Sequence, residues 1–317
     1  MHDRPMITRR NFLHRSALVA GALSIPCTRA QTVCAGADAT EKWRVGIYTR
    51  PWDQYDFRVA LDDIAAAGFR YVGLMSAKSE QGGLVISTKT TSEQAAQVAQ
   101  EVRDRRLEVT SVYGGNIPVA ESLAAGIAGM KLLIDHCATV KARSLLMGGI
   151  NNERLFDVYY RAVAETCDYA AERHVAITVK PHGGLNATGA QCRNCIERVH
   201  HENFSLWYDP GNIFFYSDGA IDPVDDAATV DGLVRHGLCV KDFTMSQVDG
   251  KLTKDVWVTP GEGKVDFPRV LARLKQGGFT TGDLVIECIR RGDGDRTTLA
   301  AEARKARLFV EQLVKNL

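Results

Sequence analysis

Residues 176–184, AITVKPHGG, place polar groups at the end of an apolar run. Successive side chains of a strand point to opposite faces, so Thr178, Lys180 and His182 share one face. Pro181 favours an extended conformation at the residue before it, which keeps this alternation as far as Lys180. A cation and an imidazole at a strand end are costly in a core. The pattern therefore indicates a site that uses both groups.

Carboxylates and a second lysine end other apolar runs. Asp209 in LWYDPGN suits either a site or an Asx turn that caps the next segment. Glu287 in LVIECI has apolar neighbours and must be paired, metal-bound or protonated. Lys241 and Asp242 in CVKDF point to opposite faces, so one of them faces inward. Glu262 in PGEGKVDF belongs to a glycine-rich loop that either covers a site or is a plain turn.

The rest of the chain supplies the elements that would position these residues. After residue 42, apolar runs alternate with amphipathic helical stretches. The predicted strands are 43–49, 71–76, 107–114, 144–149, 176–182, 204–210, 238–243 and 283–289. Eight strands alternating with eight helices predict a single-domain (β/α)8 TIM barrel over residues 43–317. No G-x-G-x-x-G follows the first run, which argues against an open doubly wound sheet.

Active sites of such barrels lie at the carboxyl ends of the strands. The residues at those ends are Arg50 with Trp52, Ser76, Tyr113, Met147, Lys180, His182, Asp209, Asn212, Lys241, Asp242 and Glu287.

The N-terminal residues predict export. TRRNFL at 8–13 places a twin arginine before a mildly apolar run that is too short for a permanent membrane anchor. Residues 1–30 are therefore expected to form a twin-arginine signal peptide, with cleavage as late as residue 39. The mature protein is then periplasmic or secreted.

The charge composition argues against nucleic acid and lipid surfaces as partners. Lys and Arg number 39 against 38 acidic residues, with no basic patch for nucleic acid and no polybasic stretch for lipid. A small molecule is the expected partner, and a homo-oligomer is compatible with the sequence. Cys192 and Cys195 form a lone C-x-x-C, which is either a pair of core residues or a local disulfide.

Four motifs in order, DPGN, VKDF, PGEGKVDF and LVIECI, resemble the sugar phosphate isomerase/epimerase superfamily with its xylose isomerase-like barrel. The resemblance implies a divalent metal, commonly Mn²⁺ or Mg²⁺, held by a glutamate, an aspartate, a histidine and a second glutamate. The metal would polarise a sugar carbonyl while the glutamates move the neighbouring proton. The aspartate falls on Asp209, the second glutamate on Glu287, and a polar contact beside the metal on Asn212.

Two ligand positions depart from that pattern: Lys180 replaces the first glutamate and Cys239 replaces the histidine. Three arrangements remain open. In the first, His182 and Cys239 complete a site with Asp209 and Glu287, a donor set that favours Zn²⁺. In the second, no metal binds and Lys180 pairs with the two carboxylates, where a fixed cation stabilises an oxyanion. In the third, Lys180 or Lys241 forms a Schiff base with the substrate.

The leading expectation is an exported isomerase- or epimerase-like enzyme that moves a proton next to the carbonyl of a sugar or keto-sugar. Glu287 is the expected base, and Lys180 or a metal polarises the carbonyl, with Lys241 also in the site. The expected sugar contacts are Trp52, Tyr113, His182, Asn212 and Glu262. The alternatives are a keto-sugar lyase without metal and a non-catalytic carbohydrate-binding barrel. A periplasmic location argues against a phosphorylated substrate.

Overall fold

The computed structural model describes residues 42–78 and 83–317. The predicted signal peptide lies outside the described residues. The barrel strands are β1 (Trp43–Tyr48), β2 (Tyr71–Leu74), β3 (Glu108–Tyr113), β4 (Ser144–Met147), β5 (Ala176–Val179), β6 (Phe204–Tyr208), β7 (Val234–Val240) and β10 (Gly282–Ile286). The helices are α1 (Phe57–Ala66), α2 (Ser92–Asp104), α3 (Leu123–Thr139), α4 (Phe156–Ala164), α5 (Cys167–Glu172), α6 (Gly189–Val199), α7 (Pro210–Tyr216), α8 (Pro223–Ala227), α9 (Phe267–Gln276) and α10 (Arg296–Lys315).

The eight strands close into a parallel barrel in the order β1-β10-β7-β6-β5-β4-β3-β2. Closure joins the first and last strands, with Trp43 opposite Gly282 and Ile47 opposite Ile286. All eight predicted strands are present, and the TIM barrel is confirmed. Parallel closure brings the carboxyl ends of all eight strands to one rim, where a barrel places its active site.

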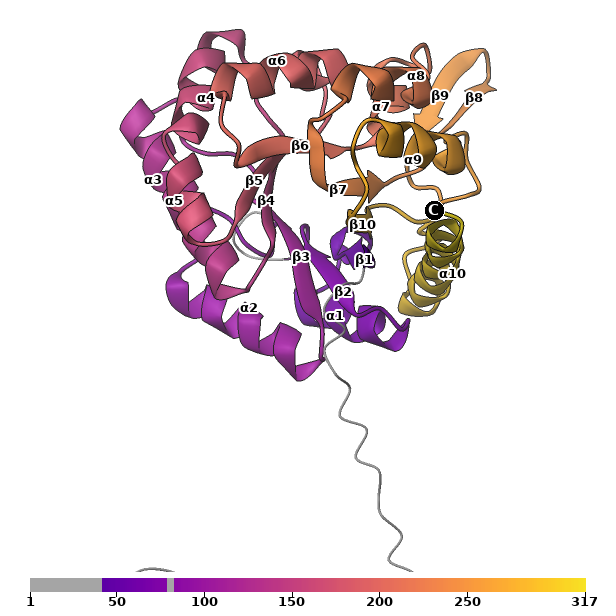
Figure 1. The fold of residues 1–317 in the computed structure, drawn as a ribbon. Coiled ribbons are helices and arrows are strands. Elements are labelled where there is room, and N and C mark those ends of the chain that lie inside the picture. The colour runs from indigo at the N-terminus through magenta and orange to yellow at the C-terminus, as the bar shows by residue number, and fades with distance from the viewer. Residues whose placement is uncertain (1–41, 79–82) are drawn as a thin grey trace, which may run out of the picture. The chain divides into compact units, whose positions relative to one another are not determined.

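Helices surround the strands (Figure 1). Their ends are set by local sequence: Thr91 and Gln94 form a capping box at α2, and Asp295 accepts from the amides of Thr297 and Thr298 at α10. Two crossovers contain two helices each, α4 with α5 after β4 and α7 with α8 after β6. No described helix is long and apolar enough to cross a membrane.

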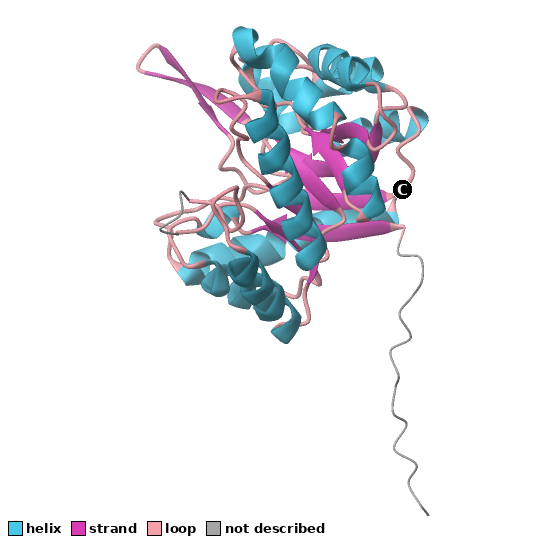
Figure 2. Ribbon diagram, turned by 90° about the vertical axis from the view of Figure 1, so that its left-hand side faces the viewer, coloured by secondary structure: helices cyan, strands magenta, loops and turns pink. Residues whose placement is uncertain are grey.

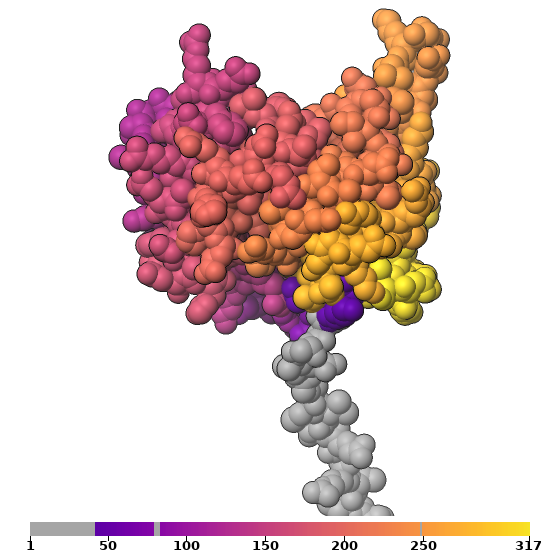
Figure 3. Space-filling model, turned by 45° about the horizontal axis from the view of Figure 1, so that its top comes forward, coloured from indigo at the N-terminus to yellow at the C-terminus, as the bar shows by residue number. Residues whose placement is uncertain are grey.

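An antiparallel hairpin interrupts the regular alternation after β7. It consists of β8 (Thr244–Val248) and β9 (Lys251–Asp255), and it projects from the barrel (Figures 2 and 3). Asp249 and Gly250 connect the strands with φ of 51° and 73°. Asp-Gly between two strands is a strong signature of a tight hairpin turn, so this element was readable from the sequence, although the barrel pattern did not include it.

A small cluster of large side chains fills the barrel interior. Its members are Tyr48, Met75, Leu146, Trp207, Cys239 and Val285, all buried. Tyr48 adds a hydrogen bond to Ser111 of β3, with 2.7 Å between the two oxygens. This packed interior supports the residues at the strand ends and gives them fixed positions.

Candidate active site

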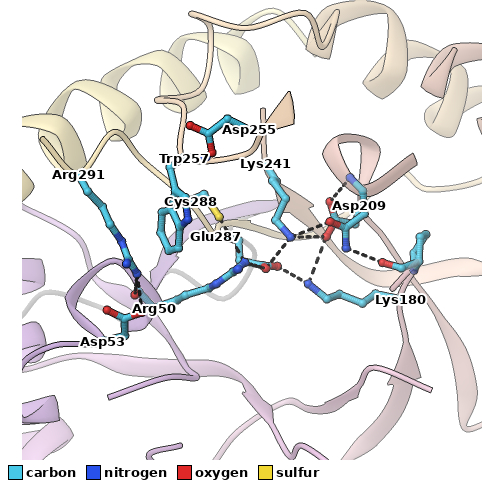
Figure 4. Close-up of polar contacts among 12 residues, drawn as sticks. Arg50, Asp53, Lys180, Asp209, Lys241, Asp255, Trp257, Glu287, Cys288 and Arg291 are labelled. Atoms are coloured by element: carbon cyan, nitrogen blue, oxygen red, sulfur yellow. Dashed lines mark hydrogen bonds and ion pairs between the residues drawn. The ribbon is translucent and has the colours of Figure 1, made fainter. Parts of the chain in front are cut away.

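Five charged residues meet at the rim of the barrel, each at the end of a different strand (Figure 4). Arg50 follows β1, Lys180 follows β5, Asp209 follows β6, Lys241 follows β7 and Glu287 follows β10. We call these five residues the rim cluster. Lys180, Lys241, Asp209 and Glu287 are at most 2% exposed, so their charges must be satisfied by one another.

The Lys180 ammonium lies between the two carboxylates. Its Nζ donates to Oδ2 of Asp209 at 3.2 Å and to Oε2 of Glu287. This is the contact that the second of the three arrangements requires. These two ion pairs explain why a lysine follows the apolar strand β5.

The Lys241 ammonium bridges the same two carboxylates from β7. Its Nζ lies 3.1 Å from Oδ2 of Asp209 and 2.6 Å from Oε1 of Glu287. It also donates to Oδ1 of Asn212 at 3.0 Å. Asp209 in turn caps α7, because its Oδ1 accepts from the amide of Asn212 at 3.0 Å. The capping role and the site role expected for Asp209 therefore occur together.

Arg50 connects the rim cluster to solvent. Its Nη1 donates to Oε1 of Glu287, and its side chain is 27% exposed. The guanidinium carbon lies 4.9 Å from the ring centre of Trp257, and that of Arg291 lies 3.3 Å from the same ring. Arg291 is held by Asp53 at 2.6 Å. The indole thus contacts two guanidinium groups at the edge of the site.

The contacts fix the protonation states. Burial by itself would raise the pKa of Glu287, but Lys180, Lys241 and Arg50 outweigh it and hold that pKa well below its usual range. Burial would lower the pKa of Lys180, but Glu287 and the other negative groups raise it well above the usual value. Lys180 is therefore a fixed cation without the free amine that a Schiff base needs, and Glu287 is a fixed anion.

The donor set does not fit a divalent metal. Asp209, Cys239 and Glu287 each offer an atom, and these atoms lie within 4.8 Å of one another. However, two ammonium groups already lie on the carboxylate oxygens and would repel a metal. Burial also raises the pKa of Cys239 well above its usual value, so a metal would have to displace the thiol proton as well as two ammonium groups.

His182 lies outside this group of ligand atoms, beside two tyrosine rings. Its ring centre is 6.0 Å from that of Tyr113 and 6.2 Å from that of Tyr216. Burial and the charge of Lys180 lower its pKa to about 3. The imidazole is therefore neutral at pH 7 and retains an unprotonated ring nitrogen.

Two of the expected sugar contacts lie elsewhere. Trp52 is fully buried and donates its indole N–H to Asp63 at 3.0 Å, so it cannot stack on a sugar. Glu262 pairs with Arg290 at 2.8 Å and with Lys305, and with no member of the rim cluster. Trp52 closely follows strand β1, and Glu262 lies in the loop between β9 and α9. Position along the chain does not fix which way such a side chain points.

The structure brings Arg50, Trp257 and Arg291 to the site instead. Arg50 is one of the strand-end residues that the barrel pattern predicts, so its place after the first strand was a usable signal. Trp257 follows the hairpin that the barrel pattern did not include, so no signal placed it at the rim.

The chain matches the family model described as a xylose isomerase-like TIM barrel over residues 61–312. It therefore belongs to that family. No curated protein sequence matches it.

Solved structures share the fold at low sequence identity. A xylose isomerase domain protein from Planctomyces limnophilus has a TM-score of 0.65 and 19% identity, covering 87% of this chain and 98% of that one. D-psicose 3-epimerase from Clostridium cellulolyticum H10 has a TM-score of 0.64 and 15% identity, with coverage of 85% and 99%. A xylose isomerase-like protein from Mycobacterium smegmatis in complex with magnesium has a TM-score of 0.62 and 13% identity, with coverage of 84% and 98%.

Proposed function

We propose that this chain is a sugar isomerase/epimerase-type enzyme that moves a proton next to the carbonyl of a sugar or keto-sugar without a metal ion. The observation that carries the proposal is the Lys180 ammonium between Asp209 and Glu287, with Lys241 on the same carboxylates. The family membership and the sugar epimerases among the structures of similar fold support the substrate class.

The net positive charge of the rim cluster suits it to stabilise an oxyanion. It contains three cations and two carboxylates, so it carries one positive charge in excess at a buried position. An enediolate forming above it would neutralise that charge, and fixed cations stabilise such an oxyanion without reorganising. Arg50 is the only one of the three cations with an exposed part, so it contacts the carbonyl oxygen.

We assign the base role to His182 rather than to Glu287. Three cations contact both oxygens of the Glu287 carboxylate, so neither oxygen is free to take a proton from the substrate. The neutral imidazole of His182 has a free ring nitrogen and lies beside the same cations. When negative charge develops on the substrate oxygen, it offsets the effect of Lys180 and raises the pKa of His182, so proton transfer and charge development assist each other.

The reaction then balances within the site. A ring nitrogen of His182 takes the proton from the carbon next to the carbonyl, the C–H electrons form a C=C bond, and the carbonyl electrons move to oxygen. In an isomerisation, the hydroxyl proton on that carbon moves to the enediolate oxygen, the electrons left on its own oxygen form a new C=O bond, and the C=C pair takes the proton back from His182 at the former carbonyl carbon. In an epimerisation, the same carbon takes a proton from the opposite face, with solvent water as the donor, and His182 releases its proton to the resulting hydroxide.

The test is proton exchange in D₂O. EDTA-treated protein is incubated with D-fructose, D-tagatose and keto-sugar glycosides, and loss of the signal of the proton next to the carbonyl is followed by ¹H NMR. We expect exchange that EDTA does not reduce, and a decrease of about 100-fold or more in His182→Gln. The matched control is His201→Gln, because His201 pairs with Asp168 away from the rim cluster.

Exchange that requires added Mn²⁺ or Mg²⁺, or that is unchanged in His182→Gln, would overturn this mechanism. Loss of a substituent from the sugar during exchange would indicate the lyase alternative. Tight sugar binding without any exchange would indicate the non-catalytic carbohydrate-binding barrel.

We also propose that the enzyme works outside the cytoplasm. The support is the TRRNFL segment and the apolar run after it. A non-phosphorylated substrate is consistent with that location.

A further inference from the structure

A cavity lies beside the rim cluster, over the carboxyl ends of β3 and β4. Its volume is about 490 Å³, within the range of small-molecule sites. Residues 116–120 and 148–155, which lead toward α3 and α4, form most of its wall. None of these residues takes part in the proposed proton transfer.

The lining has the chemistry of a carbohydrate site. Polar groups come from Asn116, Asn151, Asn152, Tyr113 and Tyr159, and apolar surface from residues such as Ile150. Among the described residues that line the cavity, none carries a carboxylate, an ammonium or a guanidinium, and the one histidine is neutral. Neutral hydrogen-bonding groups next to apolar and aromatic faces suit an uncharged polyhydroxylated ring and not a phosphate or an acid.

One of these groups lacks an acceptor. Tyr159 is 2% exposed, and its oxygen lies near the backbone N–H of Gly149, but its O–H has no acceptor among the described residues. A buried hydroxyl without an acceptor is costly, and a ligand in the cavity can supply one.

The cavity shares part of its wall with the proposed reaction site. His182 and Tyr113 line it, and the same His182 ring lies beside the rim cluster. Asn186 fixes this shared wall, because its side-chain amide donates to the backbone oxygen of Lys180 at 2.7 Å and to that of Gly148 at 2.9 Å. A ring in the cavity would therefore contact the same wall as the ring that reacts at His182.

We propose that this cavity is a subsite for a second, uncharged sugar ring, so that the substrate is a glycoside of the reacting keto-sugar and not a monosaccharide. The inference rests on the proposed function for the identity of the reacting ring. The cavity itself binds the glycosyl ring, and it does so whether or not proton transfer follows.

The experiment compares binding of one ketose with that of its glycosides. Titration calorimetry measures the Kd of the full mature chain for D-fructose, maltulose, lactulose and isomaltulose. We expect at least one of the three disaccharides to bind about tenfold or more tightly than fructose. Ala120→Trp places a large side chain in the cavity from an exposed position, and Ala301→Trp, on the exposed face of α10, is the matched control.

We expect Ala120→Trp to remove the advantage of the disaccharide and leave the fructose Kd unchanged, while Ala301→Trp changes neither. The inference is overturned if no disaccharide binds more tightly than fructose, or if Ala120→Trp weakens both ligands equally. Failure of the proposed function looks different: the disaccharide advantage and its loss in Ala120→Trp persist, but no proton exchange occurs in D₂O.

Discussion

At the scale of single residues, Lys180 decides the character of the site. Its ammonium lies between the carboxylates of Asp209 and Glu287, two of the residues that could otherwise hold a metal ion. Removing one member of a buried ion-pair network leaves the remaining charges uncompensated, which is strongly destabilising. The same position should therefore control both stability and metal affinity.

Two substitutions of Lys180 should therefore both lower stability but differ in Mn²⁺ binding. Lys180→Glu should lose about 3–5 kcal/mol of stability in EDTA. It should also gain a Mn²⁺ site, because three carboxylates then face one another, and added Mn²⁺ should restore stability. Calorimetric Mn²⁺ titration and denaturant unfolding measure both effects. Lys180→Met is the matched control, which should lose stability without gaining the site; tight Mn²⁺ binding by the wild type would contradict the prediction.

His182 predicts a specific pH dependence of stability. Its pKa is about 6.5 in an unfolded chain and about 3 in the folded protein. Between these values the unfolded chain binds more protons, so the free energy of unfolding falls as pH drops below about 6.5. Denaturant midpoints measured from pH 7 to pH 4.5 should fall more steeply in the wild type than in His182→Gln. Parallel profiles would show that His182 does not hold a lowered pKa.

At the scale of elements, one carboxylate organises the loop between β9 and α9. Asp242 accepts backbone N–H groups of Gly261, Gly263 and Val265 at 2.9, 2.8 and 3.1 Å. Neighbouring side chains along a strand point to opposite faces. Lys241 therefore contacts the rim cluster, while Asp242 binds the backbone of the loop. The loop needs glycine at 263, because a Cβ there would lie 2.2 Å from Oδ1 of Asp242.

Gly263→Ala should therefore destabilise the fold by about 1–3 kcal/mol, the usual cost of forcing extra atoms into a packed site. Thermal or denaturant unfolding measures the loss. Lys264→Ala is the control in the same loop, since Lys264 is exposed, and it should be close to neutral. Equal effects of the two substitutions would show that Asp242 does not constrain the loop.

At the scale of the whole molecule, the N-terminal residues predict the route of export independently of the barrel. The double substitution Arg9→Lys, Arg10→Lys should keep the protein in the cytoplasm, because twin-arginine export depends on that pair. Fractionation of cells followed by immunoblotting measures the distribution. The double variant should fold like the wild type, since both residues precede the first barrel strand. Unchanged export would contradict the predicted route.

The sequence by itself determined the architecture. Eight short apolar runs, separated by amphipathic segments, leave a closed parallel barrel as the simplest way to bury every strand. Closure then places the strand ends on one rim, so the strand pattern alone predicts that Lys180, Asp209, Lys241 and Glu287 meet there. The hairpin β8–β9 was readable from Asp249 and Gly250.

Only the tertiary structure decided how those residues pair and which others join them. Ion-pair partners depend on side-chain directions and distances across the rim, which strand position does not specify. Trp52 is buried in the core, where Asp63 accepts a hydrogen bond from its indole. Trp257 lies at the rim because it follows the hairpin β8–β9, which is not part of the barrel repeat. The lowered pKa of Glu287 likewise follows from three cations contributed by three different strand ends.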